Sequence, residues 1–152
     1  MTTLAILPVK GFGRAKQRLR ERVPDGPRAG LAEAMVRDVL RALGETAGID
    51  GVIVVTAEPV AAALAREAGA DVVHDPAESG QSDAVALGVR RALERGAGRV
   101  VAVPGDCPAL DPAELEALLA SEEAVVIVPD RHGTGTNALL LAPPDAIAPS
   151  FG

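Results

Sequence analysis

The sequence predicts an α/β fold in which helices cover both faces of a doubly wound, mostly parallel sheet. Short apolar runs of strand length alternate along the chain with longer segments of helical periodicity. The apolar runs are continuous, which is typical of strands buried on both faces of a parallel sheet. The chain has 152 residues and no linker, repeat or low-complexity segment, so we expect one domain over residues 1–152.

The predicted strands are short runs dominated by Val, Ile, Leu and Ala. Each is followed by a loop or a helical segment, as the alternating architecture requires. None approaches the length of about 18 apolar residues that a membrane span needs. The predicted strands are residues 4–7, 52–56, 71–74, 99–103, 124–128 and 138–141.

Helices are predicted between these strands from their apolar stripes and their end signals. Pro27 is placed where a first helix could begin, and glycines at 69 and 96 would end helices over 59–68 and 82–95. Asp111 followed by Pro112 predicts an N-cap and the first residue of a last helix. The stripe of the first helix is Leu31, Met35, Val39 and Leu43, widened by Val36 and Leu40.

Composition and charge exclude several classes of protein. The net charge is −6 and the aromatic residues are Phe12 and Phe151, which argues against a nucleic-acid-binding module built on stacking. Cys107 is the single cysteine, so no disulfide can form within the chain, and we expect a reducing, cytoplasmic location. Pro8 and Lys10 interrupt the N-terminal apolar run, so no signal peptide is recognisable.

The loop after the first predicted strand is a candidate phosphate site. Seven of the fifteen basic residues lie within 10–28, and this segment includes Lys10, Lys16 and Arg18. Glycines would let the backbone approach a phosphate, and the cations would neutralise it. Gly11-x-Gly13 lacks the third glycine of a dinucleotide fingerprint, and no Walker A pattern is present. The alternative is an exposed basic turn.

The loop after the fourth predicted strand offers a candidate metal ligand. It is Pro104-Gly105-Asp106-Cys107-Pro108, and Asp106 is a natural Mg²⁺ ligand because Mg²⁺ prefers one or two carboxylates plus substrate phosphates. The alternative is that Asp106 merely shapes a turn with the neighbouring glycine and prolines. Cys107 is expected to be a packed side chain and not a nucleophile, because no histidine partner is identifiable nearby.

Two further loops carry candidate binding residues. Residues 129–137 alternate glycines with hydroxyls, so Arg131, Thr134 and Thr136 could hold a small phosphorylated or carboxylated acid. The alternative is a glycine-rich hairpin, with an exposed His132. Residues 78–83 precede a helix, so Gly80 and Ser82 could contact a nucleotide. Helix capping by a serine is the alternative there.

Together these motifs resemble the 2-phospho-L-lactate or phosphoenolpyruvate guanylyltransferases of deazaflavin coenzyme F 420 biosynthesis. The resemblance covers essentially the whole chain, and it implies a sheet of the nucleotidyltransferase (nucleotide-diphospho-sugar transferase-like) type. Its most specific segment is the one at 130–136. The matching segments are Pro8-Val9-Lys10, Ala15-Lys16-x-Arg18-Leu19, Gly105-Asp106-x-Pro108-Ala109-Leu110, Asp130-Arg131-x-Gly133-Thr134-Gly135-Thr136 and Phe151-Gly152.

The resemblance implies an enzyme that transfers GMP from GTP to phosphoenolpyruvate or 2-phospho-L-lactate and releases pyrophosphate. Asp106 would bind Mg²⁺, and Asp106 and Lys16 would be the catalytic residues. By the resemblance, Lys10, Lys16 and Arg18 would face the triphosphate, and Thr136 and Gly152 would contact the acid. The residue patterns above add Gly80 and Ser82 as candidate nucleotide contacts, and Arg131 and Thr134 as candidate contacts to the acid.

Several points stay open at the level of sequence. Relatives continue past the position of Gly152 to a further acidic motif, so we expect this chain to be a C-terminally truncated copy. The residues alone do not choose between the two acids, among nucleoside triphosphates, or between a monomer and a homodimer. A related nucleotidyltransferase acting on CTP, a molybdopterin or a sugar phosphate is one alternative function. A non-catalytic nucleotide-binding module is another.

Overall fold

The computed structural model describes residues 1–11, 28–103, 111–129 and 136–149. Within these ranges strands and helices alternate from the first strand to the fifth, as the sequence predicts. The strands are β1 (Thr3–Val9), β2 (Gly51–Thr56), β3 (Asp71–His74), β4 (Arg99–Ala102), β5 (Val125–Pro129) and β6 (Thr136–Leu141). The helices are α2 (Arg28–Glu45), α3 (Pro59–Glu67), α4 (Gln81–Glu94) and α5 (Pro112–Leu119).

The strands form a six-stranded sheet in the order β3-β2-β1-β4-β6-β5. The pairs β1–β2, β1–β4 and β2–β3 are parallel, which confirms the prediction of a mostly parallel, doubly wound sheet. β6 is the exception, because it runs antiparallel to both β4 and β5. Its antiparallel course has a consequence for the site, since β6 begins at the edge where the parallel strands end.

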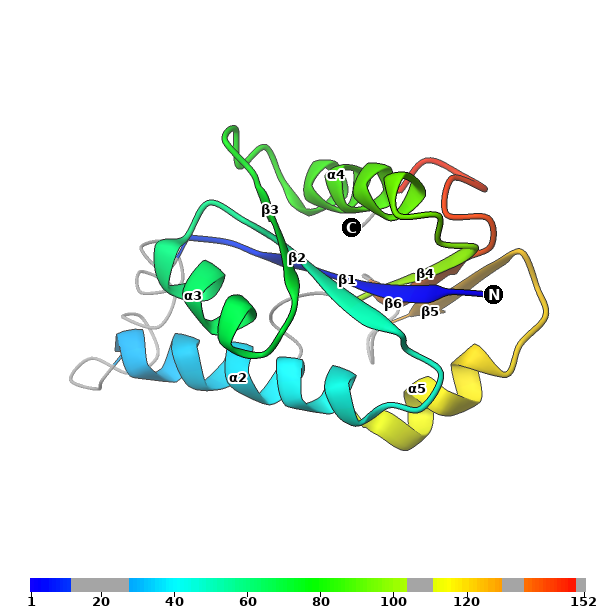
Figure 1. Cartoon of the computed structure of the whole chain (residues 1–152), viewed down its shortest axis with the longest axis horizontal. Coiled ribbons are helices and arrows are strands. Elements are labelled where there is room, and N and C mark those ends of the chain that lie inside the picture. The colour runs from blue at the N-terminus through cyan, green and yellow to red at the C-terminus, as the bar shows by residue number, and fades with distance from the viewer. Residues whose placement is uncertain (12–27, 104–110, 130–135, 150–152) are drawn as a thin grey trace.

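Helices cover both faces of the sheet, as Figure 1 shows. α2, α3 and α5 lie on one face, and their buried side chains pack with Ala5, Leu7 and Val9 of β1. α4 lies on the other face, over Leu4 and Ile6 of β1. Successive β1 residues therefore enter different cores, which explains why this strand is apolar from Leu4 to Val9.

The helix ends confirm most of the predicted signals. Asp111 caps α5 by accepting a hydrogen bond from the Ala113 N–H at 2.9 Å. Gly69 and Gly96 follow the ends of α3 and α4 with φ angles of 78° and 76°, in the left-handed region that glycine adopts at little cost. Pro27, the predicted start of the first helix, lies outside the described residues.

Two local expectations are wrong. The capping alternative for α4 fails because α4 begins at Gln81 with Gly80 at the N-cap position, so neither Ser79 nor Ser82 is the cap. The predicted stripe of α2 is also shifted at its start. Leu31 is 43% exposed, whereas the neighbouring Ala32 is only 6% exposed and packs in the core.

Within the described ranges, α2 to α5 include no helix that is both long enough and apolar enough to cross a membrane. The predicted cytoplasmic location stays a prediction.

Candidate active site at the carboxyl edge of the sheet

The parallel strands end level with one another at one edge of the sheet. Val9, at the end of β1, is in register with Thr56 at the end of β2, and Thr56 is in register with His74 at the end of β3. In open α/β sheets, ligands bind outside the carboxyl ends of the strands, near the point where the strand order reverses. Here that point lies between β1 and β4, because β2 and β3 follow on one side of β1 and β4 pairs with its other side.

The other half of the sheet contributes to the same edge. The Val103 N–H, just after β4, donates to the Ile6 carbonyl at 3.0 Å and keeps this strand beside β1. Because β6 is antiparallel, its first residue, Thr136, lies at this edge and pairs with Pro129 at the end of β5. Three described residues near this edge, Gly11, Val103 and Pro129, directly precede the segments 12–27, 104–110 and 130–135, which lie outside the described residues.

Buried hydrogen bonds fix the relative positions of the strand ends. The Thr56 hydroxyl, 2% exposed, donates to the Val9 carbonyl at 2.8 Å and accepts from the Glu58 N–H at 3.0 Å. The Asp75 N–H donates to the Thr56 carbonyl at 3.2 Å and ties the end of β3 to the end of β2. Lys10 therefore leaves β1 from a point that Thr56 holds in place.

The turn between β3 and α4 brings a carboxylate to this edge. Glu78 has a φ of 45°, and its N–H donates to Asp75 Oδ1 at 3.2 Å. Its carboxylate lies against Gly11, because a Cβ added to this glycine would be 3.1 Å from Glu78 Oε1. This contact brings the start of the basic segment next to the turn that leads into α4.

The predicted site residues that the structure describes lie at this edge. Lys10 is exposed directly after β1, and Gly80 has a φ of 123° immediately before α4. Ser82 is half-buried in the first turn of α4. Thr136 begins β6, although its side chain is not described. The predicted residues outside the described ranges are Lys16, Arg18, Asp106, Arg131, Thr134 and Gly152, together with Cys107 and His132.

Sequence reasoning missed Thr56 and Asp75 as organising residues of the site, and it included Glu78 only as the first residue of the candidate segment 78–83. Thr56 acts on a carbonyl 47 positions away in the chain, so no local pattern announces that bond. The Asp75-Pro76 pair that opens the turn was an available signal, since Asp side chains commonly accept hydrogen bonds from nearby backbone N–H groups in turns. In the described part of the chain, His, Cys, Asp and Glu form no group of three or more suited to a metal.

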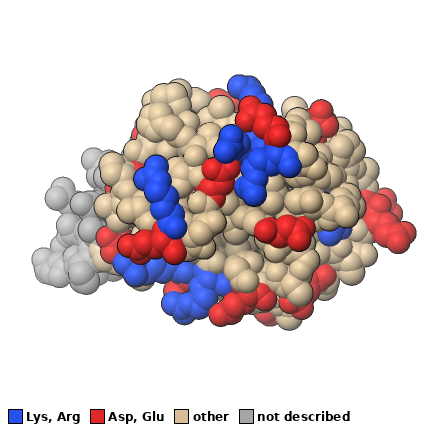
Figure 2. Space-filling view, in the orientation of Figure 1, with Lys and Arg blue, Asp and Glu red and all other residues tan. Residues whose placement is uncertain are grey.

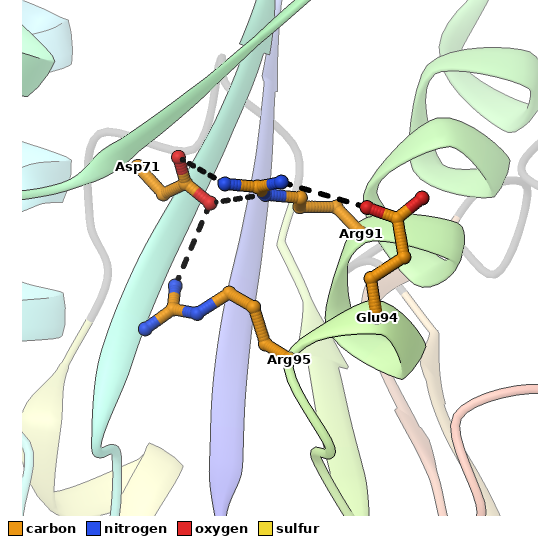
Figure 3. Close-up of polar contacts among 4 residues, drawn as sticks. All are labelled: Asp71, Arg91, Glu94 and Arg95. Carbon is orange, nitrogen blue, oxygen red and sulfur yellow. Dashed lines mark hydrogen bonds and ion pairs between the residues drawn. The ribbon is translucent and has the colours of Figure 1, made fainter.

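A second charged cluster lies away from this edge. Arg91 on α4 donates from Nε to Asp71 Oδ2 at 2.6 Å, and Arg95 approaches the same oxygen at 3.7 Å (Figure 3). The Asp71 carboxylate, through hydrogen bonding and charge, raises the pKa of Arg91. Asp71 begins β3, at the end opposite to the carboxyl edge, and acidic and basic side chains are interspersed on this face (Figure 2). The cluster therefore joins α4 to the edge strand and lies apart from the candidate site.

Comparison with known proteins gives a family for this chain. The sequence profile described as guanylyl transferase CofC like matches residues 3–152. A phosphoenolpyruvate guanylyltransferase of Conexibacter woesei is 54% identical over 156 residues, an alignment that covers 100% of this chain and 70% of the relative. The corresponding protein of Sphaerobacter thermophilus is 38% identical over 154 residues, which cover 100% of this chain and 74% of the relative.

Solved structures give the same fold. A protein of Desulfovibrio desulfuricans G20 described as a nucleotide-diphospho-sugar transferase superposes with a TM-score of 0.77 at 17% identity, covering 97% of this chain and 66% of that chain. A nucleotidyl transferase of Methanothermobacter thermautotroptrophicus superposes with a TM-score of 0.60 at 22% identity, covering 95% of this chain and 72% of that chain. At these identities the likeness supports the fold alone.

The sheet order and the fold of the solved structures, together with the guanylyltransferase relatives, define the class as nucleotidyltransferase enzymes of α/β fold. Within that class, the chain belongs to the guanylyl transferase CofC-like family. The family expected from the sequence motifs is thereby confirmed.

Proposed function

We propose that this chain transfers GMP from GTP to phosphoenolpyruvate or 2-phospho-L-lactate, and that it serves deazaflavin coenzyme F 420 biosynthesis. The observation that carries the proposal is the match of the whole chain, at 54% identity, to a relative named for phosphoenolpyruvate. We place phosphoenolpyruvate first for this reason. The arrangement of the strands supports the proposal, because β1, β4 and β5 end and β6 begins at the same edge of the sheet.

The nucleotide would bind at the end of β1 and the start of α4. Lys10 is exposed directly after β1, and the proposal adds Lys16 and Arg18 from the following segment as cations for the triphosphate. A Lys about 4 Å from one phosphate charge gains about 4 kcal/mol at an effective dielectric near 20, so a few cations can dominate binding. Gly80 and Ser82 would contact the same nucleotide from the turn before α4.

The acid would bind at the end of the sheet formed by β4, β6 and β5. Thr136 begins β6 at the carboxyl edge, directly after the segment that contains Arg131 and Thr134. Guanidinium and hydroxyl donors suit a ligand that presents one phosphate and one carboxylate. Gly152 completes the proposed set.

Mg²⁺ fits this arrangement chemically. Asp106 comes shortly after β4 in the sequence, and a carboxylate with substrate phosphates is the donor set that Mg²⁺ prefers. When bound, Mg²⁺ would neutralise phosphate charge and align the phosphate oxygens. The described residues alone do not form a complete metal cluster, so the proposed ligand is Asp106 together with the phosphates.

The proposed reaction balances without a covalent enzyme intermediate. A phosphate oxygen of the acid attacks the α-phosphorus of GTP and forms the new P–O bond. The bond from the α-phosphorus to the oxygen that bridges it to the β-phosphorus breaks, and pyrophosphate leaves with that oxygen. Residues of the chain would act by holding the two phosphates in line and by neutralising charge, which is where most enzymatic acceleration of such transfers originates.

The decisive experiment is an assay of pyrophosphate release with each of the four nucleoside triphosphates and each of the two acids. We expect release with GTP and phosphoenolpyruvate that depends on both substrates. Release with CTP and a sugar phosphate would instead support a different nucleotidyltransferase. Calorimetric binding of GTP without any turnover would support the non-catalytic alternative.

A further inference from the structure

Glu78 presents a carboxylate to the nucleotide side of the carboxyl edge. Its Oε1, Oε2 and Cδ atoms lie 3.1, 3.8 and 3.9 Å from the place where a Cβ on Gly11 would stand. The whole carboxylate is therefore next to the first residue after Lys10. Glycine at this position leaves room for it.

Hydrogen bonds of Asp75 fix the turn that carries Glu78. The Asp75 side chain accepts from the Glu78 N–H at 3.2 Å, and the Asp75 backbone N–H donates to the Thr56 carbonyl at 3.2 Å. Asp75 is 8% exposed, so this support is itself buried. The φ of 45° at Glu78 is one that residues with a Cβ rarely adopt, and the turn maintains it. The backbone position from which the Glu78 side chain leaves is therefore set by the fold.

The charge of Glu78 is not neutralised by a described cation. The ion pairs among the described residues involve Glu33, Asp38, Asp71 and Glu94, and none involves Glu78. The residue is half-buried and lies at the edge where the nucleotide is proposed to bind.

A carboxylate at this edge would repel a triphosphate but would attract neutral hydrogen-bond donors. It accepts hydrogen bonds and cannot donate them when ionised. Guanine presents two adjacent donors, N1–H and the 2-amino group, which match the two oxygens of one carboxylate. Adenine and cytosine each place an acceptor nitrogen beside their amino group, and uracil has a single N–H. The charge and shape of the group therefore favour guanine.

We propose that the Glu78 carboxylate, seated against Gly11, accepts hydrogen bonds from N1–H and the 2-amino group of guanine and thereby selects GTP. The inference rests on the proposed function, since it requires the nucleotide to occupy this edge. It makes Glu78 a specificity-determining residue and Asp75 a residue that positions it.

The test compares GTP with inosine triphosphate, whose base lacks the 2-amino group, in the parent chain and in Glu78→Gln. We measure kcat/KM for pyrophosphate release with phosphoenolpyruvate, and we measure the affinity for each nucleotide by calorimetry. The parent should prefer GTP by about 10-fold or more, the scale of one hydrogen bond to a charged group. In Glu78→Gln this preference should fall to a few-fold at most.

Two other variants separate the inference from a general effect of charge or folding. Glu58→Gln removes a half-buried carboxylate at the same edge and should leave the preference unchanged. Gly11→Ala places a methyl 3.1 Å from Glu78 Oε1, which is the flexible end of a side chain, so the carboxylate should shift without loss of the fold. This variant should also reduce the preference for GTP.

Equal losses for GTP and inosine triphosphate in Glu78→Gln would overturn the inference and leave the proposed function standing. An equal collapse of the preference in Glu58→Gln would overturn it too. If the parent neither binds nor turns over GTP in the presence of phosphoenolpyruvate, the proposed function fails and the inference fails with it.

Discussion

The Thr56 hydroxyl donates to the Val9 carbonyl at 2.8 Å and so joins the carboxyl ends of β2 and β1. The same oxygen accepts from the Glu58 N–H at 3.0 Å, at the start of the turn into α3. Since Lys10 follows Val9 directly, this one side chain fixes the point where the basic segment leaves the sheet. Stability and nucleotide binding should therefore be coupled at Thr56.

Thr56→Val keeps the shape of the side chain but leaves a buried carbonyl without its donor. We expect the free energy of unfolding to fall by about 1–3 kcal/mol, the cost of an unsatisfied buried polar group. The KM for GTP should rise several-fold because the backbone at Val9, directly before Lys10, loses the hydrogen bond that fixes its position. Urea denaturation measures the first effect, and pyrophosphate release measures the second.

Thr46→Val is the matched control for this prediction. Thr46 is 3% exposed and directly follows α2, away from the carboxyl edge. Its hydroxyl donates to the carbonyl of Ala42, in the last turn of α2, at 2.7 Å. It should alter stability but leave the KM for GTP unchanged. A similar change in KM for both variants would mean that Thr56 affects nucleotide binding only through general stability.

Gly88 lets α4 approach β1 closely, and its replacement should strain the core. A Cβ on this glycine would overlap Cγ2 of Ile6. We expect Gly88→Ala to lower the free energy of unfolding by about 1–3 kcal/mol, as overpacking typically does. Gly44→Ala is the control, because nothing lies within 4 Å of a Cβ at that helical position. It should stabilise the protein by about 0.4–1 kcal/mol, and urea denaturation of both variants tests the contrast.

The sequence predicted the order of strands and helices because continuous apolar runs and glycine or proline punctuation are local signals. It did not predict the antiparallel direction of β6, since the run Ala138–Leu141 has the same composition in either direction. The α2 stripe failed at Leu31 for a geometric reason. Steps of four residues drift by about 40° around a helix with 3.6 residues per turn, so a stripe of such steps leaves the buried face. The structure buries Ala32 instead.

The candidate site was predictable where its residues follow strands directly. Lys10 lies at the predicted edge because a loop after a parallel strand must begin there, and Gly80 ends the turn that leads from β3 into α4. The roles of Thr56 and Asp75 could not be predicted, since their partners are determined by which strands become neighbours. The contact between Glu78 and Gly11 has the same origin, because 66 intervening residues must fold before the two meet.

The ion pair between Asp71 and Arg91 should contribute modestly to stability and should depend on salt. The arginine donates to both carboxylate oxygens, at 2.6 and 3.4 Å, but its side chain is 43% exposed. We expect Asp71→Asn to lower Tm slightly at low salt, and the difference should shrink at about 1 M salt as screening increases. Asp38→Asn, at a 3.8 Å pair on α2, should have a smaller effect.

The pH dependence of this pair follows from the raised pKa of Arg91. A raised pKa in the folded state means that the stabilisation is fully present below the ordinary Arg range and is lost only as pH rises past the higher value. Titration of Arg91 should therefore leave stability unchanged between neutral and mildly alkaline pH. Thermal denaturation of parent and Arg91→Gln across that range should show a constant difference from this group, and a difference that disappears near neutral pH would contradict the assignment.

The basic segment after β1 should contribute to affinity through charge. We expect Lys16→Ala or Arg18→Ala to weaken GTP binding by about 1.5–3 kcal/mol, the net value of hydrogen bonds to charged groups. Calorimetry at low salt measures the loss, which should shrink as salt is added if the site is exposed. Arg41→Ala removes a charge from a side chain that is 67% exposed on α2 and should not alter affinity. Unchanged GTP affinity in both loop variants would contradict the proposed phosphate site.

The proposed metal ligand can be tested by comparing the same Asp→Asn substitution at Asp106 and at Asp111. Asp106→Asn keeps the size of the side chain but removes the charge that would attract Mg²⁺, so turnover should fall by at least about 10²-fold, the usual scale for losing a preorganised electrostatic partner. Folding should change little, because the sequence predicts a loop at this position. Asp111→Asn is the control, since Asp111 caps α5 through the Ala113 N–H and Asn caps helices about as well as Asp. The measurement is pyrophosphate release over a range of Mg²⁺ concentrations, with GTP and phosphoenolpyruvate. We expect Asp106→Asn to need more Mg²⁺ and still to reach a lower maximum, while Asp111→Asn follows the parent curve. If Asp106→Asn keeps both the parent rate and the parent Mg²⁺ dependence, the carboxylate only shapes its turn and the metal ligands lie elsewhere.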